Sequence, residues 1–300
     1  WRTYFESWHQ VGMGSSLATP PWVAVTAIAS LAVLGKVQFL ITTFFLVAPL
    51  LIMWTGFVLL KRLTSNNWIS IPAAFLYAIS PVTIAATSSG HIGTLILLIF
   101  VPLVAITLHD WWAIEKYSWR KIFAVSLLFS LLYSFTLMSF VIALLASVVI
   151  SIANYKEFLS TQDQNVWKDR LIKRSALVFV PFLVNAPYSL EAIVNPSRFL
   201  TEPGLGIPGG GALAVLTGNP GGLGSVPMWL VSPIILVLVI SLFSSTHARG
   251  IAEYGIGAMS LAVLVGSLSI STRGNEGAAK VWAGPVLSIV TVAAVAAGVV

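Results

Sequence analysis

The sequence contains no cysteine, and only 9% of its 300 residues are charged. The absence of cysteine excludes a disulfide framework, a zinc ribbon and a thiol nucleophile. Soluble domains carry about 25% Asp, Glu, Lys and Arg, so this chain has too few charges to cover a water-facing surface. Its basic side chains lie in short segments between apolar runs and form no single patch, which argues against nucleic acid as a partner.

Hydrophobic residues make up 57% of the chain and occur in runs long enough to cross a bilayer. We therefore expect an all-α fold, a polytopic transmembrane helical bundle of about 7–9 membrane segments, with membrane lipid as a partner. The clear spans are Val37–Leu60, Ile92–Leu108, Ser175–Ile193, Trp229–Ser244, Ile251–Ile270 and a run from Pro285 onward. A weaker span, Trp68–Thr87, contains two prolines and is expected to lie inside the bundle. The chain starts with Trp1 and ends in an apolar run, as expected of an internal fragment of a longer chain.

The basic residues predict the orientation, because Lys and Arg accumulate in cytoplasmic loops. The larger group, which we place inside, comprises Lys61, Arg62, Lys116, Arg120, Lys121, Lys156, Lys168, Arg170, Lys173, Arg174 and Arg249; the smaller, outside, comprises Arg2, Lys36, Arg198, Arg273 and Lys280. Both loops beside the run Ile122–Ile152 carry inside residues, so this run must turn back near Thr136–Phe140. Trp22–Leu34 is expected to be a short helix entering from the outer face.

The expected organisation is a single membrane domain over residues 1–300. It has an extracytoplasmic loop and interfacial helix over 1–36, a cytoplasmic amphipathic loop over 153–174 and an extracytoplasmic Gly/Pro-rich loop over 194–227. Within the cytoplasmic loop, Tyr155–Arg174 is typical of an amphipathic helix on the inner leaflet. The same helix can instead dock a cytosolic catalytic domain.

The outer segments hold the residues that can perform chemistry. Glu6 and His9 are spaced to share one helical face, where the carboxylate can act as a general base or bind a divalent cation. The alternative is an interfacial helix whose polar residues face water. His91, in the connection Ser88–Gly93, can bind a phosphate or a substrate hydroxyl, or it can simply cap the next helix.

The outer loop 195–227 contains Arg198, Glu202 and a glycine-rich run that spells G-x-G-x-x-G. No strand precedes this run and Pro208 occupies its turn, so we reject a dinucleotide site. We expect an irregular loop around a short apolar helix, Ala212–Leu216, acting either as a substrate lid or as a plain connection. Arg198 is the candidate to pair with a substrate phosphate. Ionisable residues are almost absent from the spans, which argues against a proton-coupled pump or a channel.

Several of these segments also resemble a known family. Trp8-His9-Gln10-Val11-Gly12-Met13-Gly14-Ser15-Ser16, the pair Pro20-Pro21, the turn Gly35-Lys36 and the segments 90–94, 196–202 and 220–225 occur in the order seen in the membrane region of large actinobacterial family 2 glycosyltransferases. The chain also resembles the GT-C class, polytopic glycosyltransferases that use polyprenyl-phosphate sugars at the outer face. In that class an acid of the first outer loop serves as base or metal partner, and the matching position is Glu6.

The resemblance implies a multi-pass protein of a bacterial plasma membrane that takes part in cell-wall polysaccharide synthesis. Its partner would be a lipid-linked sugar, with Glu6 as the catalytic residue and His9, His91, Arg198 and Glu202 as substrate-binding residues. No metal is assigned, although a divalent cation at Glu6 is compatible with the pattern. Two alternatives stay open: a transporter or flippase for a lipid-linked saccharide, and a non-catalytic membrane anchor for a cytosolic glycosyltransferase domain of the same chain.

Overall fold

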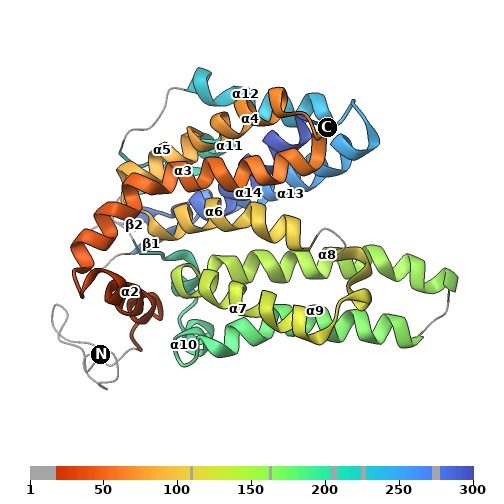
Figure 1. Ribbon diagram of the computed structural model, residues 1–300, viewed down its shortest axis with the longest axis horizontal. Helices are drawn as coiled ribbons and strands as arrows, with labels where there is room; N and C mark the ends of the chain where they lie inside the picture. The colour runs from red at the N-terminus through yellow and green to blue at the C-terminus, as the bar shows by residue number, and fades with distance from the viewer. Residues whose placement is uncertain (1–17, 109–110, 162–163, 204–207, 224–227, 272–277) are drawn as a thin grey trace. The chain divides into compact units, whose positions relative to one another are not determined.

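The computed structural model describes residues 18–108, 111–161, 164–203, 208–223, 228–271 and 278–300. These residues are mostly helical, as expected, and the helices are joined by short connections (Figure 1). The chain divides into two compact units. Unit 1 contains Trp1–Leu40 and Thr107–Phe199, and unit 2 contains Ile41–Ile106 and Leu200–Val300.

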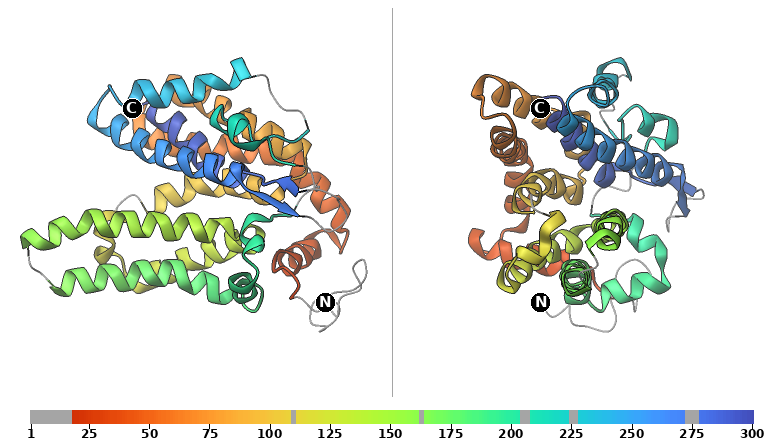
Figure 2. Two further views of the ribbon diagram at one scale, coloured as in Figure 1. Left: turned by 180° about the vertical axis from the view of Figure 1, so that it is seen from behind. Right: turned by 90° about the vertical axis from the view of Figure 1, so that its right-hand side faces the viewer.

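Unit 1 is built around three long helices that lie side by side (Figures 1 and 2). Its elements are α2 (Trp22–Ser30), η1 (Leu31–Val33), η2 (Trp111–Lys116), α7 (Trp119–Phe135), α8 (Met138–Thr161), α9 (Gln164–Val184), α10 (Tyr188–Val194) and η3 (Pro196–Leu200), the last of which ends at the first residue of unit 2. The buried side of α7 packs mainly on α9, and α8 also packs on α9. The core of unit 1 therefore lies between these three helices.

The run Ile122–Ile152 turns back on itself within the expected segment. Helix α7 ends at Phe135, Thr136 has an extended backbone (φ −149°), and α8 begins at Met138. The segments before and after the run meet at the end of the helices away from this turn. There Arg170 Nε lies 2.8 Å from Glu115 Oε2, and Lys173 Nζ donates to the Glu115 carbonyl at 2.7 Å. The sequence-based prediction of a hairpin is confirmed, because only a returning chain brings these segments together.

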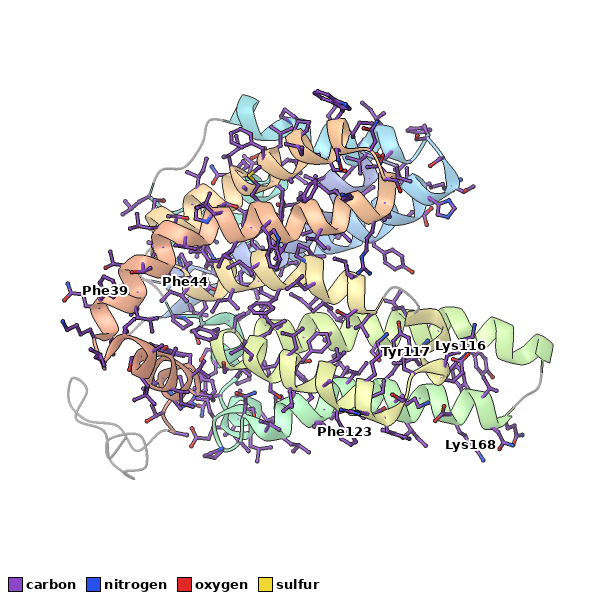
Figure 3. The ribbon with its side chains drawn as sticks, viewed as in Figure 1. Phe39, Phe44, Lys116, Tyr117, Phe123 and Lys168 are labelled. Carbon is purple, nitrogen blue, oxygen red and sulfur yellow. The ribbon has the colours of Figure 1, made fainter. Side chains whose placement is uncertain are left out.

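The contact of η2 and the start of α7 with the first half of α9 forms what we call the cationic end of unit 1, made of Glu115, Lys116, Tyr117, Lys121, Lys168, Asp169, Arg170 and Lys173. Figure 3 shows Lys116, Tyr117 and Lys168 at this end of the helices. Burial alone would raise the pKa of the Glu115 carboxyl, but the hydrogen bonds from Arg170 and from the Glu115 backbone, together with the positive charges of Arg170 and Lys116, outweigh this, and the pKa lies below its ordinary value. Lys121 lies 3.6 Å from the centre of the Tyr117 ring, a cation–π contact.

Two segments of unit 1 differ in form from the expectation. No separate amphipathic helix forms over Tyr155–Arg174, because α8 continues to Thr161 and α9 begins at Gln164, so these residues extend the two long helices. Nor is Ser175–Ile193 one straight span: α9 and α10 are bent by 99°. Pro187 has no N–H to continue the helix, and Asn185 Nδ2 donates to the Pro181 carbonyl at 2.8 Å near the break.

The helices of unit 2 pack around its C-terminal helix. Its elements are α3 (Val37–Thr64, which begins in unit 1), α4 (Asn67–Ala78), α5 (Pro81–Ser88), α6 (Ile92–Thr107), β1 (Ser269–Ser271), β2 (Ala278–Lys280), α11 (Gly211–Leu216), α12 (Met228–Ser241), α13 (Thr246–Ser267) and α14 (Gly284–Ala297). Helix α14 is buried along nearly its whole length and packs on α13, α12, α4 and α5. Small side chains allow this close packing, as where Gly255 of α13 faces Ala293 of α14.

A small β-hairpin is the element that the all-helical prediction misses. Ser269–Ser271 pairs antiparallel with Ala278–Lys280, and α13 ends at Ser267, short of the expected span end at Ile270. Serines alternate with apolar residues from Ser267 to Ser271, a period of two that favours a strand. The hairpin carries the chain from α13 to α14.

Three described helices are long and apolar enough to cross a membrane: Val37–Thr64, the α4–α5 pair Asn67–Ser88, and Thr246–Ser267. There are four if the bent pair α9–α10 counts as one span. The expected apolar runs at Ile92, Trp229 and Pro285 also form helices, but these are shorter, with 16, 14 and 14 residues. The chain therefore has the features of a membrane protein.

Candidate functional site

Three connecting segments of unit 2 meet at one end of its helices. They are the α5–α6 connection, the loop over 200–223 and the segment from β2 into α14. The Leu223 N–H donates to Ser89 Oγ at 2.9 Å, and Ser88 Oγ donates to the Leu223 carbonyl. The Ile92 N–H donates to the Pro203 carbonyl at 3.2 Å, and the Gly209 N–H donates to the Lys280 carbonyl at 3.0 Å. All three segments were assigned to the outer side from the charge pattern.

A helix-ending motif fixes the backbone of His91. Gly90 has a left-handed backbone (φ +72°), which ends α5. The His91 N–H then donates to the Ala86 carbonyl at 2.9 Å and the Gly90 N–H to the Thr87 carbonyl at 3.4 Å, the two bonds of a Schellman motif. Because α6 begins at the next residue, His91 is held between two helices and its ring points at the loop over 200–223.

The imidazole of His91 is buried between an aromatic ring and a carboxylate. It stacks on the Trp282 ring with centroids 3.8 Å apart and planes inclined by 10°. Its Nδ1 lies 2.7 Å from Glu202 Oε1, and the two side chains are 6% and 4% exposed. The distance suits an ion pair, although the angle at Nδ1 is poor for a hydrogen bond.

A chain of hydrogen bonds holds the carboxylate in place. Trp282 Nε1–H donates to Thr94 Oγ1 at 2.9 Å, and the Thr94 hydroxyl donates to Glu202 Oε1 at 2.8 Å. Thr94 is three residues after His91, so both lie on the same side of the first turn of α6. The same tryptophan thus stacks on the imidazole and, through Thr94, orients its acidic partner. We call His91, Thr94, Glu202 and Trp282 the His91 site.

Two polar atoms of the His91 site lack a partner among the described residues. They are His91 Nε2 and Glu202 Oε2, and both are buried. Buried polar atoms in proteins are hydrogen-bonded in the great majority of cases, and leaving one unpaired costs about 1–3 kcal/mol. An imidazole nitrogen and a carboxylate oxygen can each hydrogen-bond a hydroxyl group. They can also move its proton.

Glycines allow the backbone to approach the site closely. A Cβ at Gly284 would overlap Trp282 Nε1 and Thr94 Oγ1, and a Cβ at Gly222 would overlap Ser89 Oγ. In the glycine-rich run, a Cβ at Gly209 would overlap the Val281 carbonyl. Gly209 therefore allows the backbone to pack against the β2–α14 segment, and the expected short helix after the run is present as α11.

The structure brings together two of the five site residues expected from the sequence, His91 and Glu202. Glu6 and His9 lie outside the described residues. Arg198 belongs to unit 1, where its Nη2 lies 2.9 Å from Glu191 Oε2 and its guanidinium lies over the Tyr188 ring. The Arg198 guanidinium, which was expected to bind a phosphate, thus pairs with Glu191 of its own unit. The Glu191 carboxylate also accepts the Ala18 N–H.

The sequence reasoning missed Thr94 and Trp282. Thr94 has a weak signal, its spacing of three residues from His91. Trp282 has none, since an aromatic residue just before an apolar helix is typical of a membrane interface. Among the described residues, no group of three or more His, Cys, Asp or Glu side chains is placed to hold a metal ion.

Comparison with protein-family models, with curated proteins and with solved structures finds no match for this chain. The chemistry of the His91 site is therefore inferred from its own residues. The strongest features are its burial, its two polar atoms without a described partner and its place among loops that connect apolar helices.

Proposed function

We propose that this chain is the membrane domain of a bacterial cell-envelope glycosyltransferase that acts on a polyprenyl-phosphate-linked sugar at the outer face of the plasma membrane. The observation that carries the proposal is the buried His91–Glu202 pair, 2.7 Å apart, at the end of unit 2 where three predicted outer segments meet. The proposal keeps a multi-pass topology of about 7–9 membrane segments, in which the shorter apolar helices also enter the bilayer.

In this proposal His91 is the general base. As the acceptor hydroxyl oxygen bonds to the anomeric carbon of the sugar, its proton passes to His91 Nε2, and the bond between that carbon and the phosphate oxygen breaks. The products are the glycosylated acceptor, the polyprenyl phosphate and a protonated imidazole. Glu202, 2.7 Å from Nδ1, sets the orientation of the ring and stabilises its positive charge.

The chain segment at Leu223, which is bonded to Ser89, has to move before the acceptor hydroxyl can reach His91 Nε2. The imidazole is covered by Trp282, and the Leu223 N–H donates to Ser89 Oγ, two residues before His91. Glu6, the base expected from the resemblance, lies outside the described residues. Glu6→Gln is therefore tested as a separate variant. A loss confined to Glu6→Gln would place the chemistry there instead.

The test measures sugar transfer from a polyprenyl-phosphate donor in membranes that contain the full-length protein. We expect His91→Gln to lower the rate by about 10²–10⁴-fold, the usual contribution of a general base, and Glu202→Gln to lower it less. The matched control is His247→Gln, since His247 is exposed at the start of α13. All variants are compared at equal protein level and equal thermal unfolding midpoint.

Two results would contradict the proposal. Full activity in His91→Gln, with sugar transfer still dependent on the protein, would show that the chemistry does not occur at the His91 site; full activity in both His91→Gln and Glu6→Gln would favour the anchor alternative. Movement of a lipid-linked saccharide across the bilayer without transfer of its sugar would instead favour the flippase alternative.

A further inference from the structure

Unit 1 contains a groove between α8 and α9 that is unrelated to the His91 site. Its volume is about 450 Å³, within the range of roughly 300–1,000 Å³ that is usual for small-molecule pockets. One face of each helix lines it: Tyr155, Ser151 and Val148 follow at helical spacing along α8, opposite Trp167, Arg174 and Val178 along α9. The groove therefore runs along the helices rather than into the core.

A buried cation lies in this apolar groove. Arg174 is 1% exposed, and its Nη1 donates to Ser151 Oγ at 3.4 Å. A guanidinium is always charged in proteins, so an anion beside it is strongly favoured in apolar surroundings. The neighbouring cations do not line the groove: Arg170 pairs with Glu115 and Lys173 pairs with Asp169. Arg174 and Ser151 thus place one guanidinium and one hydroxyl in the lining of the groove.

The walls of the groove suit a hydrocarbon chain. Val148, Ile152 and Phe179 are 47%, 65% and 45% exposed, and they continue the groove onto an apolar outer surface. At the other end Tyr155 and Trp167 contact each other, with ring centroids 5.9 Å apart. Aromatic rings beside basic residues are typical of the headgroup level of a bilayer, and Lys168 next to Trp167 belongs to the cationic end of unit 1 (Figure 3).

We propose that this groove binds one anionic phospholipid, with its phosphate at Arg174 and Ser151 and an acyl chain along Val148, Ile152 and Phe179. The polar pair and the apolar wall are both needed, which distinguishes this ligand from a free anion or a neutral lipid. The site lies wholly in unit 1 and is independent of the proposed glycosyltransferase activity.

The experiment reconstitutes the full-length protein in phosphatidylcholine nanodiscs that contain a small fraction of brominated phosphatidylglycerol. Bromine quenches nearby tryptophan, and the signal of Trp167 is the difference between the unsubstituted protein and Trp167→Phe. We expect saturable quenching of Trp167 by the brominated phosphatidylglycerol and little by brominated phosphatidylcholine. Arg174→Gln should weaken the interaction roughly tenfold, as expected for the loss of a charged hydrogen bond.

A second variant keeps the test valid if Arg174→Gln fails to fold. Val148→Trp fills the groove from its exposed wall and leaves the guanidinium in place; quenching is then read as the difference from the Val148→Trp, Trp167→Phe double variant. We expect it also to abolish saturable quenching. Lys168→Gln is the matched control, because it removes an exposed cation from the same helix without touching the groove lining, and it should leave the affinity within about twofold.

Several outcomes would overturn the assignment. They are equal quenching by the two lipids, unchanged affinity in Val148→Trp, and displacement of the lipid by inorganic phosphate alone. Preferential retention of a polyprenyl phosphate over phosphatidylglycerol would also overturn it, since the ligand would then be a carrier lipid rather than a bilayer phospholipid.

Discussion

The cationic end of unit 1 and the His91 site of unit 2 both bury charged groups, but they complete the hydrogen bonds of those groups differently. At the cationic end, Glu115 is bonded by Arg170, and Lys173 is bonded by Asp169 and the Glu115 carbonyl. In the His91 site, Nε2 of the imidazole and Oε2 of Glu202 have no partner among the described residues. The first arrangement stabilises the contact between η2 and α9, whereas the second leaves two atoms able to bind a ligand.

The substitution expected to have the largest effect adds one methyl group to Gly284, next to the His91 site. Gly284→Ala places a Cβ against Trp282 Nε1 and Thr94 Oγ1, which should destabilise unit 2 by about 1–3 kcal/mol through overpacking. Sugar transfer should fall by roughly 100-fold, because the alanine displaces the ring that stacks on His91, the proposed base. Thermal unfolding and the transfer assay measure the two effects.

Gly257→Ala is the control for that substitution. Gly257 lies inside α13, and a Cβ there would contact nothing within 4 Å. Alanine should therefore stabilise the helix by about 0.5–1 kcal/mol and leave transfer unchanged. Equal effects of the two substitutions would show that the close approach at Gly284 has no role in the site.

A smaller effect is expected from the hydroxyl that orients Glu202. Thr94→Val keeps the shape of the side chain but removes the link between Trp282 and the carboxylate. We expect roughly a tenfold loss in kcat with little change in KM, because the carboxylate still neighbours His91 but is less well oriented. Thr94→Ser, which restores the hydroxyl, should recover most of the activity. A loss in Thr94→Ser equal to that in Thr94→Val would contradict an orienting role.

The smallest effect should come from the cationic end, and it concerns stability alone. Glu115→Gln removes the ion pair with Arg170 and should lower the free energy of unfolding by about 1 kcal/mol at neutral pH. Because the pKa of Glu115 is lowered in the folded protein, this stabilisation is present above the unfolded pKa, roughly 4.3, and is lost as the pH falls through the folded value.

Unfolding midpoints of the unsubstituted protein and Glu115→Gln, measured in detergent from pH 7 to pH 3, test this dependence. The difference between the two should stay constant down to about pH 5 and then shrink. A difference that grows on acidification would mean that Glu115 is protonated in its native contact. Sugar transfer at neutral pH should be the same in both proteins at equal protein level.

Helices were predictable where an apolar run alone determines the element. Ile92–Thr107 differs by one residue from the expected span, Val37–Thr64 starts where its run starts, and Gly284–Ala297 starts one residue before its run. The 99° bend between α9 and α10 was not predicted, because hydropathy alone does not register the break at Pro187. The hairpin that starts at Ser269 was predictable in principle from its alternation, but it is short and follows directly on a helix.

The site was predictable only in its separate parts. His91 and Glu202 stood out because charged side chains are rare in this chain, but nothing local indicates that they meet. Their association depends on contacts between distant segments, such as the hydrogen bond from Thr94 to Glu202 across 108 residues of sequence. Arg198 shows the converse: its residue type suited a phosphate, and the fold pairs it with Glu191.

The central claim is that His91 and Glu202 act as one unit on the acceptor hydroxyl, and a double-mutant cycle on sugar transfer tests it most directly. If Glu202 works through His91, the double variant His91→Gln, Glu202→Gln should be no slower than His91→Gln alone. If instead the losses of the two single variants multiply in the double variant, or if neither substitution slows transfer, the pair is not the catalytic unit of this protein.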